Sequence, residues 1–508
     1  MQSKSFTAST LYSAIKQTAE SRGLATALVH ENRVTTYAEL IRQVDLVASY
    51  LHDLGLRQGE TISAFSQNCP EFAIYFYAAA KLGLVFVPLN FNLTETEIAY
   101  ILRHCEAKYL FWDEAAASTM KVDVSGVGFK PLQIPEVTLA TAECPCDSRI
   151  NPDSDLVIAY TSGSTGNPKA VAISHRSTLK AALSLIELWD LSDKDTTIVA
   201  APLGFLLGLS TATTVGLLAG MKVVIHRRFH PAEVLEAFIK HKATVYNGVP
   251  TMYSMMLEYS EQQDKSFDLS GMRAIISSGA PMPDELLKRF ASKFGKSLQN
   301  YYGMTECYPL IGKYAADPLP LAHGAVGKIV PGALIYAINP DGKACAPLQE
   351  GEFLVKAPSM MTRYHKDPVL TQSVFQDGWF KTGDLGYIDE QGYVYITGRI
   401  KDVIIKGGAN ISPLEVENTL MIHPDVASVA VIGVPDKIYG ETPIAYVVKR
   451  PGSILDQQTV VAHATTHLAK FKIPSAIIFC LELPVGKTGK VDKNALRKEW
   501  DKSHQATA

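Results

Sequence analysis

The feature that most constrains this chain is a loop rich in glycine and hydroxyl side chains at residues 161–166, between two apolar runs. The run at 156–160 predicts a strand that enters the loop, and the run at 170–175 predicts a strand that leaves it. Glycines allow backbone N–H groups to face an anion, hydroxyls add donors, and Lys169 adds a positive charge. A flexible linker has a similar composition, but a short loop held by a strand at each end favours a phosphate-binding site. Its six residues are Thr161, Ser162, Gly163, Ser164, Thr165 and Gly166.

The spacing of the glycines and the lysine excludes a Walker-type phosphate loop. That loop has the pattern G-x-x-x-x-G-K-[ST] and runs directly into a helix. Here Lys169 stands three residues after the second glycine and is followed by Ala170. The stretch TSGSTGNPKA instead resembles the phosphate loop TSGSTGxPKG of the superfamily that contains acyl- and aryl-CoA synthetases, adenylation domains and firefly luciferase. Ala170 replaces a glycine of that pattern, a departure that is expected to cost little.

Composition limits the class of protein. The chain has 508 residues, which predicts two or more domains. Its 47% hydrophobic and 19% charged residues are typical of a globular protein. The net charge of −3 provides no global basic field, so we expect no nucleic-acid partner. The seven scattered cysteines indicate a reducing compartment, and Cys144 and Cys146 are expected to be free thiols in a loop.

No segment predicts a secretory signal or a membrane span. The amino terminus lacks the apolar core that a signal peptide needs. The longest apolar stretches, at 72–89 and 209–225, are interrupted by Lys81 and Lys222 and fall short of the roughly 20 apolar residues of a spanning helix. We interpret both as buried helix–strand segments and expect a cytoplasmic protein.

Helical and strand patterns alternate over the first 110 residues. Residues 35–55 show helical spacing of apolar side chains and stop at a glycine, and residues 71–83 predict a buried helix between two strands. Such alternation predicts a parallel or mixed sheet with helices on both faces. The superfamily resemblance implies an α/β fold with two domains. Residues 1–400 would form a large N-terminal domain of mixed sheets flanked by helices with a β-barrel-like part, and residues 401–508 a small, mobile α+β domain.

The motif NYYGMTE at residues 300–306 matches the superfamily pattern Y-G-x-T-E. The resemblance implies that Tyr302 stacks on adenine, that Thr305 donates to the α-phosphate and that Glu306 holds Mg²⁺, with Thr161 near the ion. Mg²⁺ prefers one or two carboxylates combined with phosphate oxygens. Without the resemblance, Glu306 would be interpreted as a surface carboxylate and Tyr302 as a packed aromatic. The other residues implied to bind ATP or AMP here are Ser278, Gly279, Ala280, Asn300, Tyr301 and Gly303.

The stretch WFKTGD at residues 379–384 matches a second superfamily element. Its carboxylate, Asp384, can accept hydrogen bonds from both ribose hydroxyls, as acidic residues do in other nucleotide sites. A turn aspartate is the alternative interpretation, because the sequence that follows is rich in turn residues. Arg399 resembles the arginine that contacts ribose and phosphate.

The resemblance also assigns roles near the carboxyl end. Lys401 matches the hinge position, and Gly407 and Gly408 match the backbone that lines the pantetheine tunnel, although a plain turn is the alternative. Lys472 is assigned to a CoA phosphate. Lys490 matches the catalytic lysine, whose point charge suits the charge that develops on the α-phosphate. Lys169 is assigned to assist catalysis, whereas Lys487 and Lys493 are neighbours of Lys490 in a lysine cluster.

The acyl pocket is implied to be lined by Phe205, Gly248, Ser277 and Tyr301. Phe205 stands where histidine is common in the superfamily, and a core phenylalanine is the open alternative. Residues 204–210 contain no aspartate, and a buried substrate ammonium without a partner is costly, which argues against an amino-acid substrate. Tyr301 stands where long-chain relatives often have glycine and malonate-activating relatives have arginine. We therefore expect an uncharged aryl or short-to-medium-chain monocarboxylic acid.

The ordered motifs imply an ATP-dependent carboxylate–CoA ligase. The enzyme would convert an acid and Mg·ATP into acyl-AMP and pyrophosphate and then pass the acyl group to the CoA thiol, so ATP, Mg²⁺ and CoA are expected. The alternative acceptor is the phosphopantetheine of a carrier protein. A regulatory ATP-binding relative is disfavoured by the presence of Lys490, Glu306 and Asp384. Either a monomer or a homodimer is compatible with the sequence.

Overall fold

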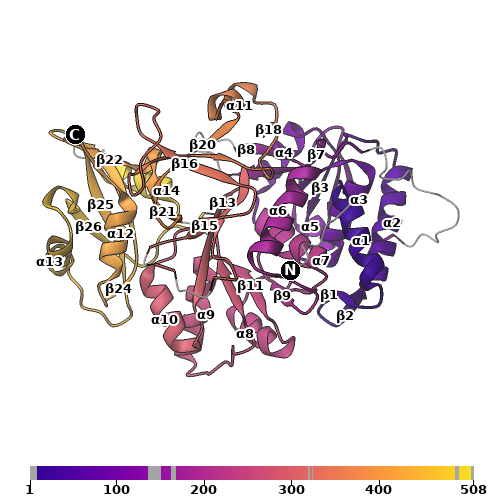
Figure 1. Cartoon of the computed structure of the whole chain (residues 1–508), viewed down its shortest axis with the longest axis horizontal. Helices are drawn as coiled ribbons and strands as arrows, with labels where there is room; N and C mark the ends of the chain where they lie inside the picture. The colour runs from indigo at the N-terminus through magenta and orange to yellow at the C-terminus, as the bar shows by residue number, and fades with distance from the viewer. Residues whose placement is uncertain are drawn as a thin grey trace.

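The computed structural model describes residues 8–135, 150–161, 168–317, 321–322, 324–486 and 491–504. Three sheets organise these residues, and the chain runs through the two larger ones before it enters the third. Figure 1 shows the C-terminal segments gathered at one end of the molecule, opposite the helices that begin the chain.

The largest sheet has 14 strands within the described ranges and changes from parallel to antiparallel across its width. Its strands are β1 (Thr26–His30), β2 (Arg33–Thr36), β9 (Thr196–Val199), β10 (Lys222–Ile225), β11 (Val245–Gly248), β12 (Ala274–Ser277), β13 (Leu298–Met304), β14 (Cys307–Gly312), β15 (Gly327–Ile329), β16 (Leu334–Ile338), β17 (Gly351–Lys356), β19 (Phe375–Gln376), β20 (Trp379–Ile388) and β21 (Tyr393–Arg399). The order β1-β10-β9-β11-β12-β13 is parallel. From β13 onward the neighbouring strands are antiparallel, in the order β14, β15, β21, β20, β17 and β16. These strands correspond to the β-barrel-like part expected from the superfamily resemblance.

The second sheet has seven strands in the order β18-β8-β7-β4-β3-β5-β6. They are β3 (Thr61–Phe65), β4 (Val85–Leu89), β5 (Ala107–Trp112), β6 (Gly128–Pro131), β7 (Asp155–Thr161), β8 (Lys169–Ser174) and β18 (Arg363–Tyr364). The strands from β7 to β6 are parallel, whereas β8 and β18 are antiparallel additions at one edge. The strands predicted on either side of the phosphate loop are therefore confirmed as β7 and β8.

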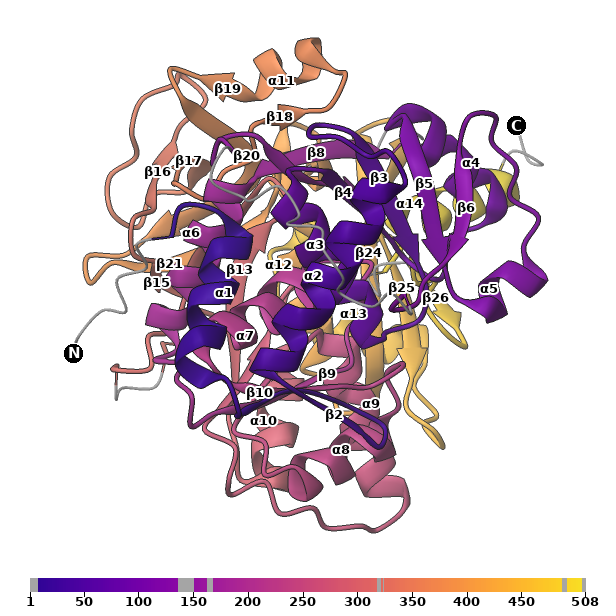
Figure 2. The ribbon, with the colours of Figure 1, turned by 90° about the vertical axis from the view of Figure 1, so that its right-hand side faces the viewer.

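Helices cover both faces of the seven-stranded sheet and of the parallel half of the larger sheet, as the alternating sequence pattern predicted. Those of the large body are α1 (Leu11–Arg22), α2 (Tyr37–Asp53), α3 (Pro70–Leu82), α4 (Glu95–His104), α5 (Glu114–Thr119), α6 (His175–Leu188), the π-helix η2 (Leu207–Thr214), α7 (Val215–Ala219), α8 (Pro231–Lys240), α9 (Pro250–Gln262), α10 (Asp284–Phe294) and α11 (Pro368–Val374). One core joins Tyr37 and Phe76 of the helices to Phe86 of β4 and Val223 of β10, so α1, α2, α3, α6 and α7 lie between the sheets. Figure 2 shows α1–α3 between the strands β3–β5 and the strands β9 and β10.

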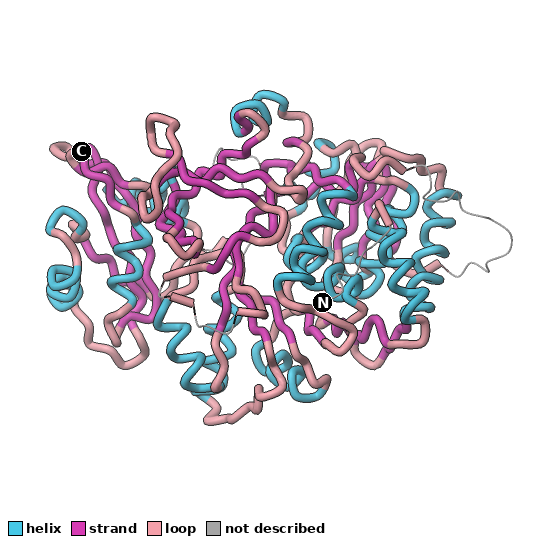
Figure 3. The backbone as a smooth tube through the Cα atoms, in the orientation of Figure 1, coloured by secondary structure: helices cyan, strands magenta, loops and turns pink. Residues whose placement is uncertain are grey.

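The outer faces of the sheets have their own helices. Ile98 and Ala116 bring α4 and α5 onto the seven-stranded sheet. Phe238, Tyr253 and Phe290 bring α8, α9 and α10 onto the parallel half of the larger sheet. Around the parallel strands five layers result, with strands in two layers between three layers of helices. Figure 3 shows helices gathered around the N-terminal half of the chain and strands along the upper edge of the molecule. The predicted α/β class with mixed sheets is confirmed.

The third sheet begins after a short 3₁₀ turn, η3 (Ile400–Asp402). Its strands are β22 (Ile404–Lys406), β23 (Ala409–Ile411), β24 (Val426–Asp436), β25 (Gly440–Lys449) and β26 (Ala476–Cys480), and its helices are α12 (Pro413–Met421), α13 (Gln457–His467), the 3₁₀ turn η4 (Lys470–Lys472) and α14 (Lys493–His504). Leu420 of α12 and Val460 of α13 pack on one face, and Leu496 of α14 packs on the other. The predicted small α+β C-terminal unit is present. Within the described part of the chain, no helix combines the length and apolarity needed to cross a bilayer.

The carboxyl ends of the parallel strands in the two large sheets face a common seam. Asn68, just after β3, donates its side-chain amide to the carbonyls of Ala201 and His226 at 3.0 and 3.1 Å, in the loops after β9 and β10. A Cβ atom at Gly204 would lie 2.5 Å from Cα of Asn90, just after β4, so this approach requires glycine. Ligands of open α/β sheets bind outside the carboxyl ends of the strands. The seam is therefore where a ligand site is expected.

Candidate active site

The motif NYYGMTE lies at the carboxyl end of β13. The strand pairs in parallel with β12 up to Asn300 and then turns back through Thr305 and Glu306 into β14. Both residues thus occupy a tight turn that projects from the sheet edge. Asn300 has a buried side-chain oxygen with no hydrogen-bond partner in the described structure, which leaves an acceptor free for a ligand.

The residues Ser278, Gly279 and Ala280 follow β12, next to this turn. Ser278 is buried, whereas Gly279 is exposed and has φ of +86°, a backbone conformation that favours glycine. Gly303 stays within β13, and a Cβ there would meet Cβ of Tyr308 at 2.9 Å. The local backbone therefore requires glycine at both Gly279 and Gly303, independently of any contact with a ligand.

Tyr302, Asp384 and Arg399 form one cluster. Tyr302 donates its hydroxyl hydrogen to Oδ2 of Asp384, and Arg399 Nε lies 2.8 Å from Oδ1 of the same carboxylate. Asp384 is almost fully buried, while about half of the Arg399 side chain is exposed (48%). Burial and the adjacent carboxylate raise the pKa of the Tyr302 hydroxyl well above its ordinary value, so it remains a donor.

The position of Asp384 excludes one of the two interpretations that the sequence left open. Asp384 is not a turn aspartate, because it lies within β20 and pairs with Arg399 of β21. A buried carboxylate needs compensating charge and donors, which Arg399 and Tyr302 supply. The carboxylate keeps further lone pairs, since each oxygen has one partner among the described side chains.

Glu306, Tyr364 and Lys169 form a second cluster beside the first. Tyr364 donates its hydroxyl hydrogen to Oε1 of Glu306 at 2.7 Å. The Lys169 ammonium lies 5.2 Å from the centroid of the Tyr364 ring, within the range of a cation–π contact. Burial, followed by the nearby Glu306 carboxylate, raises the pKa of the Tyr364 hydroxyl. The sequence predicts no role for Tyr364, because its partner Glu306 stands 58 positions away.

The phosphate loop is described only at its two ends. Thr161 and Lys169 are register partners and form the last pair of the β7–β8 hairpin. Ala170 is buried in β8 next to Lys169 and packs in the core against the seven-stranded sheet, so its methyl group is accommodated where the superfamily pattern has glycine. The predicted residues between these ends, Ser162, Gly163, Ser164, Thr165 and Gly166, lie outside the described residues.

The four residues assigned to the acyl pocket lie along the seam. Gly248 and Ser277 are register partners at the carboxyl ends of β11 and β12, and Ser277 Oγ is buried without a partner in the described structure. Phe205 is half-buried and follows Gly204 at the point where the loop crosses the end of β4.

Tyr301 points into the core beneath the π-helix η2. Its hydroxyl lies 3.4 Å from Oγ1 of Thr211, and its ring makes an edge contact with Trp189 at a centroid distance of 5.5 Å. Short π-helical stretches are frequent at functional sites. The sequence did not indicate the π-helix or Thr211, since apolar spacing alone does not separate a π-helix from an α-helix.

The residues assigned to the hinge and CoA lie in the C-terminal unit. Lys401 is exposed in η3, between β21 and β22. Gly407 and Gly408 form the exposed turn between β22 and β23, with φ of +58° and +85°. The Lys472 ammonium lies 2.6 and 2.7 Å from the two carboxylate oxygens of Glu415. Lys487 and Lys490 lie outside the described residues.

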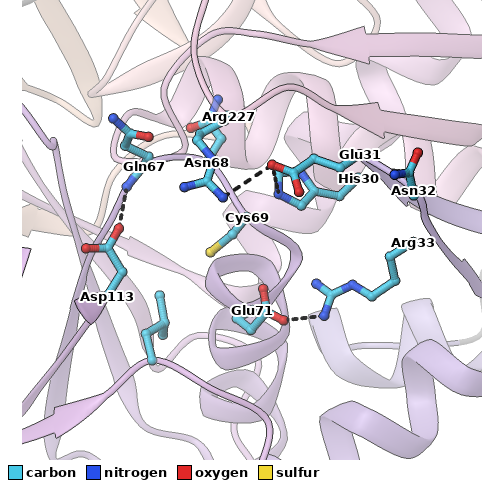
Figure 4. A pocket seen from close by; sticks show the side chains of 11 residues that line it. His30, Glu31, Asn32, Arg33, Gln67, Asn68, Cys69, Glu71, Asp113 and Arg227 are labelled. Atoms are coloured by element: carbon cyan, nitrogen blue, oxygen red, sulfur yellow. Dashed lines mark hydrogen bonds and ion pairs between the residues drawn. The ribbon is translucent and has the colours of Figure 1, made fainter. Parts of the chain in front are cut away.

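A cavity of about 600 Å³ lies away from both clusters, beside the loops after β1, β3 and β10 (Figure 4). Four of its charged side chains form two ion pairs, and Asp113 accepts from the backbone N–H groups of Gln67 and Ala116. Arg33 lies 2.7 Å from Glu71, and Arg227 lies 3.2 Å from Glu31. None of the residues predicted from the sequence lines this cavity.

A carboxylate buried beside a tyrosine and an arginine, with a phosphate-loop hairpin nearby, is typical of a nucleotide-binding α/β enzyme. A family model for AMP-binding enzymes matches residues 15–365, and a model for the C-terminal domain of AMP-binding enzymes matches residues 415–490. The chain therefore belongs to the AMP-binding enzyme family.

Known relatives cover nearly the whole chain. Feruloyl-CoA synthase of Amycolatopsis sp is 35% identical over 94% of this chain and 96% of its own length. Indoleacetate–CoA ligase of Aromatoleum aromaticum is 32% identical over 93% of this chain and 94% of its own. The structure of ATP-bound MatB from Rhodopseudomonas palustris superposes with a TM-score of 0.88 at 31% identity, over 98% of this chain and 99% of that one. The predicted superfamily is confirmed, and with it the class of an AMP-forming acid–thiol ligase.

Proposed function

We propose that this protein is an ATP-dependent carboxylate–CoA ligase that activates an aryl or short-to-medium-chain monocarboxylic acid. The observation that carries the proposal is that β13 joins the two clusters. Its Tyr302 binds the Asp384–Arg399 pair, and its terminal turn presents Glu306 next to Tyr364 and Lys169. Nucleoside-binding and phosphate-binding groups thus project from a single strand end.

In the first half-reaction the chain binds and orients ATP and the acid. Asp384 accepts the ribose hydroxyls, Arg399 contacts the ribose and α-phosphate, Tyr302 and Asn300 receive the adenine, and Ser278, Gly279 and Ala280 form the backbone wall. Thr305 donates to the α-phosphate, while Lys169 and the phosphate loop hold the β- and γ-phosphates. An acid oxygen then attacks the α-phosphorus and pyrophosphate leaves, so positioning and charge neutralisation carry the step.

The donor set near Glu306 fits Mg²⁺. Glu306 has a second oxygen that no described side chain binds, and Thr161 adds a hydroxyl at the end of β7. Mg²⁺ takes hard oxygen ligands and usually one or two carboxylates. Bound there, the ion would neutralise charge on the phosphate oxygens.

The second half-reaction requires the C-terminal unit to present a different face. We propose that residues 401–508 rotate about Lys401 against residues 1–400. The strand β21 ends at Arg399 and β22 starts a separate sheet at Ile404, which supports a pivot in the exposed turn between them. Lys490 serves the adenylation step, whereas Gly407, Gly408 and Lys472 guide CoA to the acyl-adenylate.

We infer the class of acid from the residues that lie along the seam. Tyr301 is neutral and fixed against Trp189, so it fills space that a long acyl chain would need. Gly248 adjoins Tyr246 and Tyr253, to which a Cβ there would be 3.0 and 3.2 Å away. We infer from these side chains a short acyl site with aromatic walls, which would favour flat, uncharged acids. The names of the two relatives above point to aryl acids.

The test is a screen for pyrophosphate release over carboxylic acids with Mg·ATP, followed by detection of the acyl-CoA product. We expect turnover with aryl acids and little with dicarboxylates or amino acids. Tyr301→Gly should move the preference toward longer acids. Turnover with a carrier protein and none with free CoA would favour the alternative acceptor, and pyrophosphate release with no acid of any class would refute the ligase proposal.

A further inference from the structure

The segment of residues 360–365, called here the bridging segment, connects the two large sheets. On one side, Met361 donates its backbone N–H to the carbonyl of Glu306 at 2.7 Å. On the other side, Thr362 and His365 donate to the carbonyls of Ala172 and Ala170 at 2.8 and 2.7 Å, so the segment adds β18 to the edge of β8. The bridging segment therefore ties the Glu306 turn to the strand that leaves the phosphate loop.

A charged pair fixes the bridging segment from outside. Arg363 makes two contacts with the Asp155 carboxylate of β7, with Nη2–Oδ2 at 2.5 Å and Nη1–Oδ1 at 3.1 Å. Fork-shaped arginine–carboxylate pairs define orientation as well as distance. The next residue, Tyr364, is consequently held with its side chain pointing to the opposite face of the strand, toward the site.

Tyr364 contacts both groups that the phosphate chemistry needs. Its hydroxyl binds Glu306 Oε1 at 2.7 Å, and the Lys169 ammonium lies over its ring at 5.2 Å. The Tyr364 side chain is buried, so both contacts are part of the packed interior and not contacts between mobile surface side chains. A carboxylate that is held through one oxygen offers the other in a defined direction, which is how hydrogen-bonded neighbours tune metal ligands.

We propose that Tyr364 is a positioning residue that sets the direction of the Glu306 carboxylate toward Mg²⁺·ATP and supports the Lys169 ammonium through its ring. The inference rests on the proposed function, since it assigns Glu306 to the metal. Its two contacts are separable. The hydroxyl acts through Glu306 and matters only when a metal is bound, whereas the ring acts through Lys169 and matters for the phosphates with or without metal.

The experiment measures ATP binding to the full-length protein by calorimetry, once with Mn²⁺ and once in EDTA. Tyr364→Phe removes the hydroxyl and keeps the ring, and it should weaken binding of Mn·ATP by roughly 10- to 100-fold with metal-free ATP unchanged. Tyr364→Leu removes the ring as well and should weaken both. Since no carboxylic acid is needed, the unknown substrate does not enter the measurement.

Two further variants separate positioning from structure. Tyr75→Phe removes another buried tyrosine hydroxyl, which donates to the carbonyl of Gln133 at 2.9 Å, and should leave both affinities unchanged. In a Glu306→Gln background, Tyr364→Phe should add no further loss, because the hydroxyl has lost the carboxylate through which it acts.

Three outcomes are decisive. Wild-type protein that fails to bind Mn·ATP refutes the proposed function itself. Wild-type protein that binds, with Tyr364→Phe equal to Tyr75→Phe, refutes only the positioning role. An equal loss for Tyr364→Phe with metal and in EDTA also refutes it, because that pattern indicates general loosening of the site.

Discussion

Arg399 Nε lies 2.8 Å from Oδ1 of Asp384, and the two residues are register partners on β20 and β21. The pair fixes a nearly fully buried carboxylate in the antiparallel half of the large sheet, and Arg399 lies two residues before Lys401, the proposed hinge. The residue proposed to bind ribose and the start of the proposed hinge are thereby coupled through one ion pair.

Asp384→Asn should raise the KM for ATP by roughly 10- to 100-fold, because hydrogen bonds to charged groups contribute about 1.5–3 kcal/mol each. It should also lower the free energy of unfolding by about 1–3 kcal/mol, since Arg399 and Tyr302 lose a charged acceptor. Pyrophosphate-release kinetics and denaturant unfolding measure the two effects. Asp153→Asn is the control, because Asp153 pairs with Arg176 at the surface. Equal behaviour of the two variants would contradict the ribose role.

Acidification should destabilise the protein through His175. This residue begins α6, is fully buried, and both of its ring nitrogens lack a partner in the described structure. Burial lowers its pKa from 6.5 to about 4. The unfolded chain therefore binds the proton first as pH falls, so stability is complete above pH 6.5 and is lost progressively between pH 6.5 and 4. The loss at pH 5 is about 2 kcal/mol.

Thermal or denaturant unfolding at pH 7.5, 6 and 5 checks this expectation. His175→Leu should flatten the pH dependence in this range, whatever its effect on stability at neutral pH. His467→Leu, at an exposed histidine, should retain the wild-type slope. A wild-type slope in His175→Leu would show that other groups cause the acid sensitivity.

Local patterns predicted the parts of the fold that depend on neighbouring residues. The helix expected at 35–55 is α2, which begins with a capping box between Thr36 and Glu39. The buried helix expected at 71–83 is α3, which ends at Gly83 with φ of +67°. Both depend on periodicity and end signals that lie within a few residues of each other.

The site required tertiary information. Motifs placed Tyr302, Asp384 and Arg399 in one site, but their mutual bonds depend on β20 and β21 meeting β13 across the sheet. Tyr364 carries no local signal for its contact with Glu306, because Tyr364 lies on β18 whereas Glu306 lies in the turn between β13 and β14. Packing likewise decides the π-helix at Leu207–Thr214, where Thr213 Oγ1 donates to the carbonyl of Gly208.

Lys472 should contribute to the binding of CoA and not to the adenylation step. Its ammonium is shared by both oxygens of Glu415, so a CoA phosphate must compete with that carboxylate. Lys472→Ala should raise the KM for CoA by roughly 3- to 10-fold, as expected when one charge-assisted contact is lost, with acid-dependent pyrophosphate release unchanged. Glu415→Gln should lower the KM for CoA because it frees the lysine. An unchanged KM for CoA in both variants would remove Lys472 from the CoA site.

Lys490 should be needed for adenylation and dispensable for thioester formation. Lys490→Ala is expected to slow acid-dependent pyrophosphate release by on the order of 10²–10³-fold, the usual effect of removing a group that stabilises developing charge. Thiolysis of supplied acyl-AMP by CoA should stay within a few-fold of wild type, since the α-phosphate chemistry is then already complete.

Lys493→Ala is the matched control from the same lysine cluster. Lys493 Nζ lies 2.6 Å from Oε1 of Glu417, and burial raises the pKa of that carboxyl. Loss of the lysine should therefore reduce the stability of the C-terminal unit. It should not slow pyrophosphate release selectively over thiolysis. If Lys490→Ala lost both half-reactions while folding remained intact, the lysine would serve binding in general, and the alternation of the C-terminal unit would lose its main support.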